Sequence, residues 1–347
     1  GGYQSVDEYA DLMRVSAASA GNDHRLGGNE APPAIVSIFL GDELTAVLKS
    51  IEEDTYFDEH QSVQLETGAH VLPHFMKDNT DRNRTSPFAF TGNKFEFRML
   101  GSSASVATPN IILNTAVAEA LSQFAKELEG TAPEDMEHAV HELIKRAIKK
   151  HKKVIFNGNG YTEEWVEEAK KRGLYNLEST PDCLPQFISD KNVELFTKHH
   201  IFTKEEIFSR YEILLENYVK TIGIEAKTMK EMLTKDFLPA VSSYAASVSD
   251  NALAMKALAP SVPTASAESL VSSLGDAYEK ISSALSTLDE EIQEIDKKGS
   301  MQESADYCHK TVLATMDELR AAADEAEAKI PDEELPYPTY DALLFSV

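Results

Sequence analysis

Three charged residues, Lys94, Glu96 and Arg98, alternate with two phenylalanines in the segment NKFEFRML. Successive side chains of a β-strand point to opposite faces, so this spacing predicts a strand over residues 93–100, with the three charges about 7 Å apart in a row on one face. The order cation, carboxylate, cation suits a site that binds anions and a metal ion. A solvated outer strand face with cross-strand ion pairs explains the row equally well when the strand is considered alone.

A second polar segment, NDHRLGGNE, carries Arg25 and Glu30 on either side of Gly27 and Gly28. Adjacent glycines let the backbone approach a ligand closely or move as a flap. Arg84 lies shortly before the charged strand, and arginine is the preferred side chain for gripping phosphate and carboxylate groups. Taken alone, the glycine-bearing segment is better explained as a surface turn before a buried strand.

The elements that must position these residues follow from apolar spacing and capping signals. Ser5 opens a capping box and a helix that is expected to end near Gly21, and a polar loop at 22–30 follows. Residues 34–40 are apolar and β-branched, which predicts a buried strand, with a short helix to about Ile51 after it. Further helices are predicted at 109–129, 134–153, 162–172 and 204–219.

The C-terminal third has a different pattern, in which apolar residues recur at alternating spacings of four and three. The first series covers 270–295 and the second covers 301–323, with a short break between them. Two long helices joined by a short loop predict an antiparallel hairpin. No cluster of residues in it suggests chemistry, so we predict a structural role.

The composition is that of an ordinary globular protein with a strong acidic excess. Of 347 residues, 42% are apolar and 26% charged, and the formal net charge is −25. Such a surface repels phosphate backbones and anionic lipids, so we expect no nucleic-acid and no membrane partner. Two distant cysteines, Cys183 and Cys308, fit a reducing cytoplasm. The chain opens abruptly in a helix without a signal peptide, which suggests a piece of a larger protein.

Other signals have simpler explanations than chemistry. The closely spaced histidines are His70 and His74, His138 and His141, and His199 and His200. None has a third ligand in a recognisable motif, which favours surface or packing histidines over a metal site. The turn at 157–160 lacks a phosphate-loop pattern, and a tight turn with Thr162 as a helix cap explains it better. The basic stretch at 145–153 is expected to form intramolecular or intersubunit salt bridges.

Taken together, the motifs are more specific than any of them alone. NDHRLGGNEAP, NRTSPFAF, KFEFR and ATPN occur in this order and resemble the C-terminal motif series of glutamine synthetases. The segments RVSAASAGNDHRL and NEAPPAIVSIFLGDEL are similar to the corresponding sequences of the type III subfamily. Residues 154–230 resemble the closing helices of the family, and 231–335 resemble the extra helical region of type III. The resemblance covers essentially the whole chain, but only the later half of a family catalytic domain.

The resemblance implies a role for four of the charged residues on substrate, nucleotide and metal. Arg25 and Arg98 match arginines that contact the carboxylate of the glutamate substrate. Lys94 falls where an arginine commonly lies beside the nucleotide, so the positive charge is kept but the planar fork is lost. Glu96 matches a carboxylate ligand of a divalent metal.

Two further residues match catalytic positions of the family. Glu30 matches the flap glutamate that closes over the site and helps take a proton from ammonium. Arg84 matches the arginine on the transferring phosphoryl group of the nucleotide. A second family arginine falls at Ala89 or its neighbours here, so one phosphate contact is missing or supplied elsewhere. The stretch between Glu30 and Arg84 is also longer than in the short bacterial forms.

The resemblance implies an α+β fold in two parts. Residues 1–230 would form the C-terminal part of the catalytic domain, with antiparallel strands and helices. Residues 231–347 would form a helical extension with an antiparallel hairpin and a C-terminal tail.

The implied activity is that of a glutamate–ammonia ligase, which uses glutamate, ammonia and ATP with Mg²⁺ or Mn²⁺. The family works as a ring-shaped homo-oligomer, a dodecamer, in the cytoplasm. The other metal ligands are expected upstream of Gly1, so the isolated chain is expected to be inactive. Two alternatives stay open: a related γ-glutamyl ligase that uses another amine, and a non-catalytic oligomerisation or scaffold module.

Overall fold

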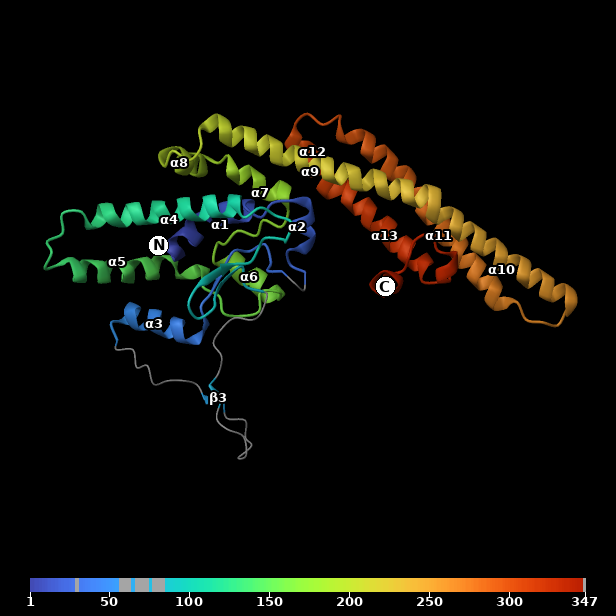
Figure 1. Ribbon diagram of the computed structural model, residues 1–347, viewed down its shortest axis with the longest axis horizontal. Helices are drawn as coiled ribbons and strands as arrows, with labels where there is room; N and C mark the ends of the chain where they lie inside the picture. Colours follow the sequence, from blue (N-terminus) through green and yellow to red (C-terminus); the bar gives the residue numbers. More distant parts are fainter. Residues whose placement is uncertain (29–30, 56–63, 66–74, 77–84, 346–347) are drawn as a thin grey trace. The chain divides into compact units, whose positions relative to one another are not determined.

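The computed structural model describes residues 1–28, 31–55, 64–65, 75–76 and 85–345. The chain divides into two compact units, Gly1–Leu214 and Leu215–Val347, and the boundary falls inside one long helix, α9. The elements up to that helix are, in chain order (Figure 1), α1 Gly2–Val15, α2 Ala20–Arg25, β1 Ile38–Phe39, α3 Gly41–Glu53, β2 Gln64–Leu65, β3 Phe75–Met76, β4 Phe88–Phe90, β5 Phe95–Phe97, α4 Ala107–Leu128, α5 Met136–His151, η1 Lys152–Val154, α6 Glu163–Lys171, α7 Thr180–Phe187, α8 Asp190–Lys198 and α9 Lys204–Met232.

The N-terminal helix differs from the prediction at both ends. α1 begins before Ser5, whose hydroxyl donates to a backbone carbonyl from inside the helix instead of capping it. The helix ends at Val15 rather than near Gly21, and Ser19 then caps the separate helix α2. Residues 22–25 of the predicted polar loop are therefore helical, because a serine outside the predicted loop supplies the missing cap.

A small sheet in the first unit has the strand order β1–β4–β5. β1 pairs with β4 in parallel and β4 pairs with β5 antiparallel, so the expectation of antiparallel strands holds for only one of the two pairings. The strands predicted at 34–40 and 93–100 shorten to two and three residues. The physical reason is their common partner β4, which offers only three residues for pairing.

The helices of the first unit pack around α1. This helix contacts α4, α5 and α7, and α4 and α5 lie side by side (Figure 1). The helices predicted at 109–129, 134–153 and 162–172 are confirmed as α4, α5 and α6. Thr162 caps α6 by accepting a hydrogen bond from the Trp165 amide at 3.3 Å, as predicted. Trp165 is fully buried and its ring stacks on Phe156.

The basic stretch at 145–153 forms intramolecular salt bridges, which confirms one of the two predicted alternatives. The acidic partners lie in α1, in α3, at the residue that directly follows α3, and near the C-terminal end of α4. The pairs are Lys145 with Asp54, Arg146 with Glu127, Lys150 with Glu8, His151 with Asp7, Lys152 with Glu52 and Lys153 with Asp7.

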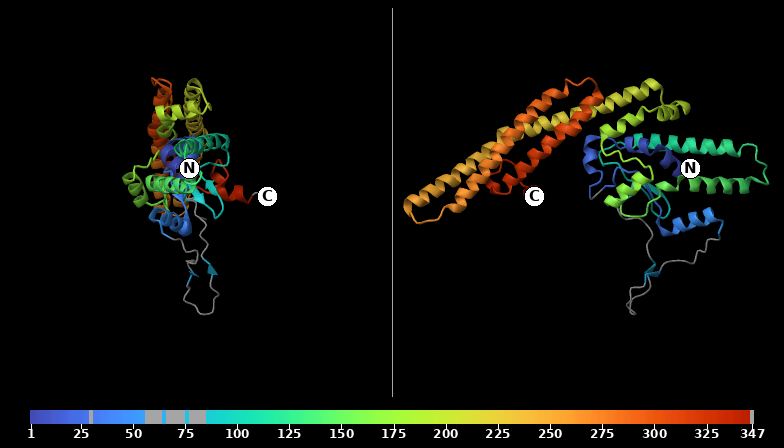
Figure 2. Two further views of the ribbon diagram at one scale, coloured as in Figure 1. Left: turned by 90° about the vertical axis from the view of Figure 1, so that its left-hand side faces the viewer. Right: turned by 180° about the vertical axis from the view of Figure 1, so that it is seen from behind.

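The described residues of the second unit form helices joined by loops, with no strand among them. Its elements after α9 are η2 Leu233–Phe237, a turn of π-helix, α10 Leu238–Leu258, α11 Ala265–Ile295, α12 Met301–Tyr307, η3 Cys308–Val312, again π-helical, α13 Leu313–Glu327, η4 Asp332–Glu334 and α14 Tyr340–Leu344. α11 packs against both α10 and α13 (Figure 2). Ser304 donates to the Ile295 carbonyl and Thr315 donates to Glu291, so α12 and α13 run antiparallel to α11.

The two cysteines, Cys183 and Cys308, are both free and buried. In the part of the chain that the structure describes, no helix combines the length and the apolar character needed to cross a membrane.

Candidate functional site

Four of the six predicted site residues lie in the described part of the chain. They are Arg25 at the end of α2, Lys94 just before β5, Glu96 within β5 and Arg98 just after it. Glu30 and Arg84 lie outside the described residues, so their implied roles stay predictions.

The charged row along β5 has the predicted arrangement. Arg98 donates to Glu96 Oε2 from Nε at 3.2 Å and from Nη2 at 3.1 Å, and Lys94 Nζ lies 3.5 Å from Glu96 Oε1. The three side chains therefore share one face, with the carboxylate between the two cations. The hydrogen bond from Arg98, followed by the charge of Arg98 and the contact with Lys94, lowers the pKa of Glu96.

The phenylalanines of the strand pack against β4. The rings of Phe97 and Phe88 have centroids 5.3 Å apart, and those of Phe95 and Phe90 are 5.2 Å apart. These are the cross-strand partners in the β4–β5 register. Aromatic pairs across two strands stabilise the hairpin, and so they hold the charged face of β5 in place.

Arg25 is tied to the chain that follows β5. Its Nε donates to Asn22 Oδ1 at 2.9 Å and its Nη2 donates to the Met99 carbonyl at 2.6 Å. Partial burial lowers the pKa of Arg25, but a guanidinium keeps its proton at neutral pH. Because Met99 directly follows Arg98, the structure brings the two predicted carboxylate-binding segments together.

A buried ion pair fixes α2 from its other side. Arg14 of α1 is 1% exposed, and its Nη2 lies 2.8 Å from Asp23 Oδ1. Asp23 also accepts hydrogen bonds from the Thr180 amide at 2.6 Å and the Thr180 hydroxyl at 2.9 Å. Arg14 Nε donates to the Leu177 carbonyl at 2.7 Å. The residue next to Asn22 is thus anchored to both α1 and the start of α7.

Sequence reasoning missed Arg14, Asn22 and Asp23 as supports of this site. Arg14 is the one of these residues that the sequence could have indicated. It follows the apolar residues of α1 that line the core, and a charged side chain buried there needs a partner. Asn22 and Asp23 lie in the segment NDHRLGGNE, where polar side chains are equally typical of an exposed turn.

The described residues do not form a divalent-cation site at Glu96 by themselves. Each carboxylate oxygen already faces a cation, Oε1 that of Lys94 and Oε2 that of Arg98. Mg²⁺ and Mn²⁺ need several oxygen ligands around them. Within the described part of the chain, the one group of three potential ligands lies elsewhere. A metal at Glu96 would require ligands from outside the described residues.

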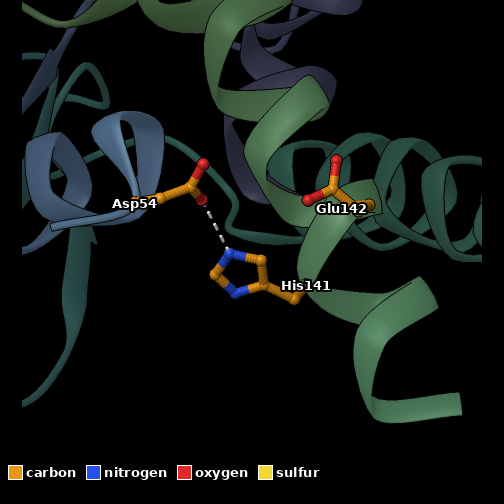
Figure 3. A group of neighbouring side chains, drawn as sticks. All are labelled: Asp54, His141 and Glu142. Carbon is orange, nitrogen blue, oxygen red and sulfur yellow. Dashed lines mark hydrogen bonds and ion pairs between the residues drawn. The ribbon is translucent and has the colours of Figure 1, made fainter. Parts of the chain in front are cut away.

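That other group consists of Asp54, His141 and Glu142, all exposed (Figure 3). His141 Nε2 lies 3.3 Å from Asp54 Oδ1, and Lys145 pairs with the other oxygen of Asp54. The hydrogen bond from Lys145, more than that from His141, lowers the pKa of Asp54. An ammonium group on the carboxylate opposes a bound cation, so we interpret the group as a surface ion-pair cluster.

The histidine predictions can be checked at several of the six positions. His141 is a surface residue and His199 packs against the buried carboxylate of Glu119 at 2.6 Å, so the interpretation as surface or packing histidines is confirmed for these two. His70 and His74 lie outside the described residues.

Comparison with known proteins shows what the chain is similar to. Residues 139–256 match the family model described as the glutamine synthetase C-terminal domain. The chain is 48% identical over 344 residues to a glutamine synthetase of Butyrivibrio fibrisolvens, and the match covers 99% of this chain and 49% of that protein. The predicted resemblance to glutamine synthetases is confirmed.

Two further relatives carry names of the same family. A protein of Dictyostelium discoideum named type-3 glutamine synthetase is 39% identical over 350 residues, which cover 99% of this chain and 47% of the relative. A glutamine synthetase of Bacteroides fragilis is 34% identical, with 98% of this chain and 48% of the relative covered. The predicted resemblance to type III enzymes is confirmed. The chain spans about half the length of the relatives it matches.

Proposed function

We propose that this chain supplies the C-terminal part of the active site of a glutamate–ammonia ligase. The observation that carries the proposal is the hydrogen bond from Arg25 to the carbonyl of Met99, the residue that directly follows Arg98. Arginines on two adjoining segments suit the carboxylate of an amino acid, because a guanidinium grips a carboxylate with two parallel hydrogen bonds. The names of the relatives support the same substrate class.

The proposed roles follow the motifs. Arg25 and Arg98 hold the carboxylate of glutamate, and Lys94 lies beside the nucleotide. Arg84 acts on the transferring phosphoryl group of ATP, and Glu30 helps take a proton from ammonium. These two positions lie outside the described residues, so their support is the motif resemblance alone.

The proposed reaction has two steps. The carboxylate of the glutamate side chain is a poor acylating agent, so one of its oxygens first attacks the terminal phosphorus of ATP, forming γ-glutamyl phosphate and releasing ADP. The nitrogen of ammonia then attacks the acyl carbon, a proton is lost from nitrogen, and phosphate leaves with its oxygen to give glutamine. Negative charge develops on oxygen in both steps, and fixed arginines stabilise such charge.

For a metal ion we propose a smaller contribution from this chain than a complete set of ligands. Glu96 would contribute one carboxylate to Mg²⁺ or Mn²⁺, with the remaining ligands supplied by residues outside those described. Because Lys94 and Arg98 already engage this carboxylate, we assign no reaction step to a metal here.

The assembly and the domain division are also proposals. We propose that residues 1–230 are the later part of the catalytic domain and that 231–347 are a family extension built on the antiparallel hairpin of α11 with α12 and α13. We further propose a ring-shaped homo-oligomer, a dodecamer as in the family. The two free, buried thiols support a cytoplasmic location.

A second candidate function is a non-catalytic oligomerisation or scaffold module. The incomplete cation site around Glu96 is the observation that favours it. The ligase proposal and this alternative make opposite predictions for phosphate release by a longer protein that contains the chain.

The experiment measures phosphate release that depends on glutamate, ATP and Mg²⁺, in the isolated chain and in a protein extended to the length of its relatives. We expect activity with ammonium only in the extended protein. Activity with methylamine but not with ammonium would replace the proposal with a ligase for another amine. Inactivity of the extended protein with either nitrogen donor would favour the scaffold module. Activity of the isolated chain would contradict the proposed need for outside metal ligands.

A further inference from the structure

Asn22 lies between the two segments that carry the proposed carboxylate-binding arginines. The side chain is 5% exposed. Its Nδ2 donates to the Ala17 carbonyl at 2.7 Å and to the Met99 carbonyl at 2.9 Å, while its Oδ1 accepts from Arg25 Nε. The opposite amide orientation would turn its oxygen toward two carbonyl oxygens, so the network itself selects this one. Both the NH2 group and the oxygen of this buried amide thus have hydrogen-bond partners.

This arrangement selects one edge of the Arg25 guanidinium for a ligand. The edge formed by Nε and Nη2 is held by Asn22 Oδ1 and the Met99 carbonyl. A guanidinium presents five N–H bonds in a planar fork, and a carboxylate accepts two parallel bonds from one edge. The opposite edge, formed by Nη1 and Nη2, is therefore the one that can grip a carboxylate with two bonds.

Gly101 packs closely against the same contact. A Cβ atom added at this position would lie 3.3 Å from Asn22 Oδ1 and 3.5 Å from Arg25 Nε. The first distance is tighter than ordinary van der Waals contact, so an alanine would displace the amide oxygen by a few tenths of an ångström. Glycine at 101 leaves the hydrogen bond between Asn22 and Arg25 undisturbed.

We propose that Asn22 is a positioning residue for recognition of the substrate carboxylate. Its Oδ1 holds Arg25 at Nε, and its Nδ2 donates to the Met99 carbonyl, which also accepts from Arg25 Nη2 and lies one residue from Arg98. One backbone oxygen accepts hydrogen bonds from both Asn22 and Arg25, and it thereby sets the spacing between the two arginines. Without the amide, the guanidinium can rotate away from the geometry that a carboxylate requires. This inference rests on the proposed function.

The test compares Asn22→Ala with Asn176→Ala in the extended, active protein. Asn176 is an exposed asparagine whose amide donates to the nearby Glu178 side chain, so it is a matched control. Initial rates of phosphate release give KM separately for glutamate and for ATP. For Asn22→Ala we expect the KM for glutamate to rise about tenfold, the effect of losing one hydrogen bond to a charged group. The KM for ATP should stay close to that of the parent protein.

Two further variants separate positioning from general damage to the fold. Asn22→Asp keeps the acceptor for Arg25 but loses both donors and places a negative charge beside the guanidinium, so the KM for glutamate should rise further. Gly101→Ala leaves the Asn22 amide intact and shifts it only slightly. We therefore expect the KM for glutamate to rise about two- to threefold, with an unchanged melting temperature. Gly101→Ala therefore still tests the proposal if Asn22→Ala does not fold.

The Arg25→Ala background distinguishes failure of this inference from failure of the proposed function. If Asn22 acts through Arg25, adding Asn22→Ala to Arg25→Ala should raise the KM for glutamate no further. A full additional rise in that background would overturn the positioning role. So would equal increases in the KM for glutamate and for ATP, or an unchanged KM for glutamate in Asn22→Ala while Arg25→Ala raises it. If Arg25→Ala itself leaves the KM for glutamate unchanged, the proposed function of Arg25 fails and this inference fails with it.

Discussion

The two units of the molecule differ in what they bury. Among the described residues, the buried ionisable side chains of Asp, Glu, Arg and His all lie in Gly1–Leu214: Asp11, Arg14, Glu119 and His151. The buried polar residues of Leu215–Val347 are hydroxyl-bearing only, namely Thr264, Ser304 and Thr315. The rest of that second core consists of leucine, isoleucine, alanine and similar apolar residues.

The core of the first unit therefore holds ionisable groups in fixed positions, whereas the core of the second unit is formed by packing of mainly apolar side chains. Burying a charge costs free energy unless a partner and further hydrogen bonds satisfy it, and an apolar core of the same volume is often at least as stable. The first unit retains one such pair, Arg14 with Asp23, in the segment that carries Arg25. We interpret this buried ion pair as the means by which that segment is held in one geometry.

The largest effect on stability that would test this comparison is expected from a substitution of Arg14. Arg14→Leu removes the cationic partner of Asp23, which keeps its hydrogen bonds from Thr180, and the donor to the Leu177 carbonyl, so unfolding free energy should fall by about 3–5 kcal/mol. Trp165 is the single tryptophan of the chain and is buried in the first unit, so its fluorescence during urea denaturation reports on that unit alone.

Arg146→Leu is the matched control for Arg14→Leu, because Arg146 also lies in the first unit. Arg146 forms an exposed ion pair with Glu127, and such pairs contribute about 0–1 kcal/mol. A loss at Arg14 as small as that at Arg146 would contradict the importance assigned to the buried charge.

A smaller or similar loss is expected in the second unit from a purely apolar change. Leu288 on α11 is 0% exposed, and Leu288→Ala should cost about 2–5 kcal/mol through lost burial and a residual cavity. Hydrogen exchange of α11 amides measures this loss locally. Leu253, which is 66% exposed, gives the control Leu253→Ala with little change. If the two leucines behaved alike, the packed core assigned to the second unit would be wrong.

The smallest effect is expected at Glu119, and it depends on pH. Burial alone would raise the pKa of Glu119, but hydrogen bonds from Lys198, Gln123 and His199 outweigh it and lower the pKa to about 2. The folded value lies below the ordinary value of 4.5. The contribution to stability is therefore present above about pH 4.5 and is lost as pH falls toward about 2.

Glu119→Gln tests this dependence. At neutral pH it should lower unfolding free energy by about 1–3 kcal/mol, and the stabilities of variant and parent should converge as pH falls from about 4.5 toward 2. Urea denaturation followed by Trp165 fluorescence across this pH range gives both curves. A constant difference between the curves at all pH values would show that the carboxylate charge does not matter.

The sequence was sufficient for the long helices and insufficient for the short elements. α4, α5 and α6 were predicted correctly because apolar periodicity over many residues and the Thr162 cap are local signals. α2 was missed because a six-residue helix leaves little periodicity and its cap, Ser19, precedes the motif. The strands were predicted too long because their length is set by β4, a partner distant in sequence.

The site was predictable in its residue types but not in its supports. The row Lys94, Glu96 and Arg98 follows from alternation along one strand, which is local. The hydrogen bond from Asn22 to Met99 joins residues that are far apart in sequence. The pairing of Arg14 with the Leu177 carbonyl spans an even longer separation. Contacts of this kind depend on tertiary packing, and no spacing rule in the sequence encodes them.

The most direct test of the account is the glutamate dependence of Arg25→Lys and Arg98→Lys in the extended protein. Lysine keeps the charge but cannot grip a carboxylate with a planar fork. The account predicts that the KM for glutamate rises about ten- to a hundredfold in each variant while the KM for ATP changes little. An unchanged KM for glutamate in both variants, in a protein that makes glutamine, would contradict the assignment of these arginines to the substrate carboxylate.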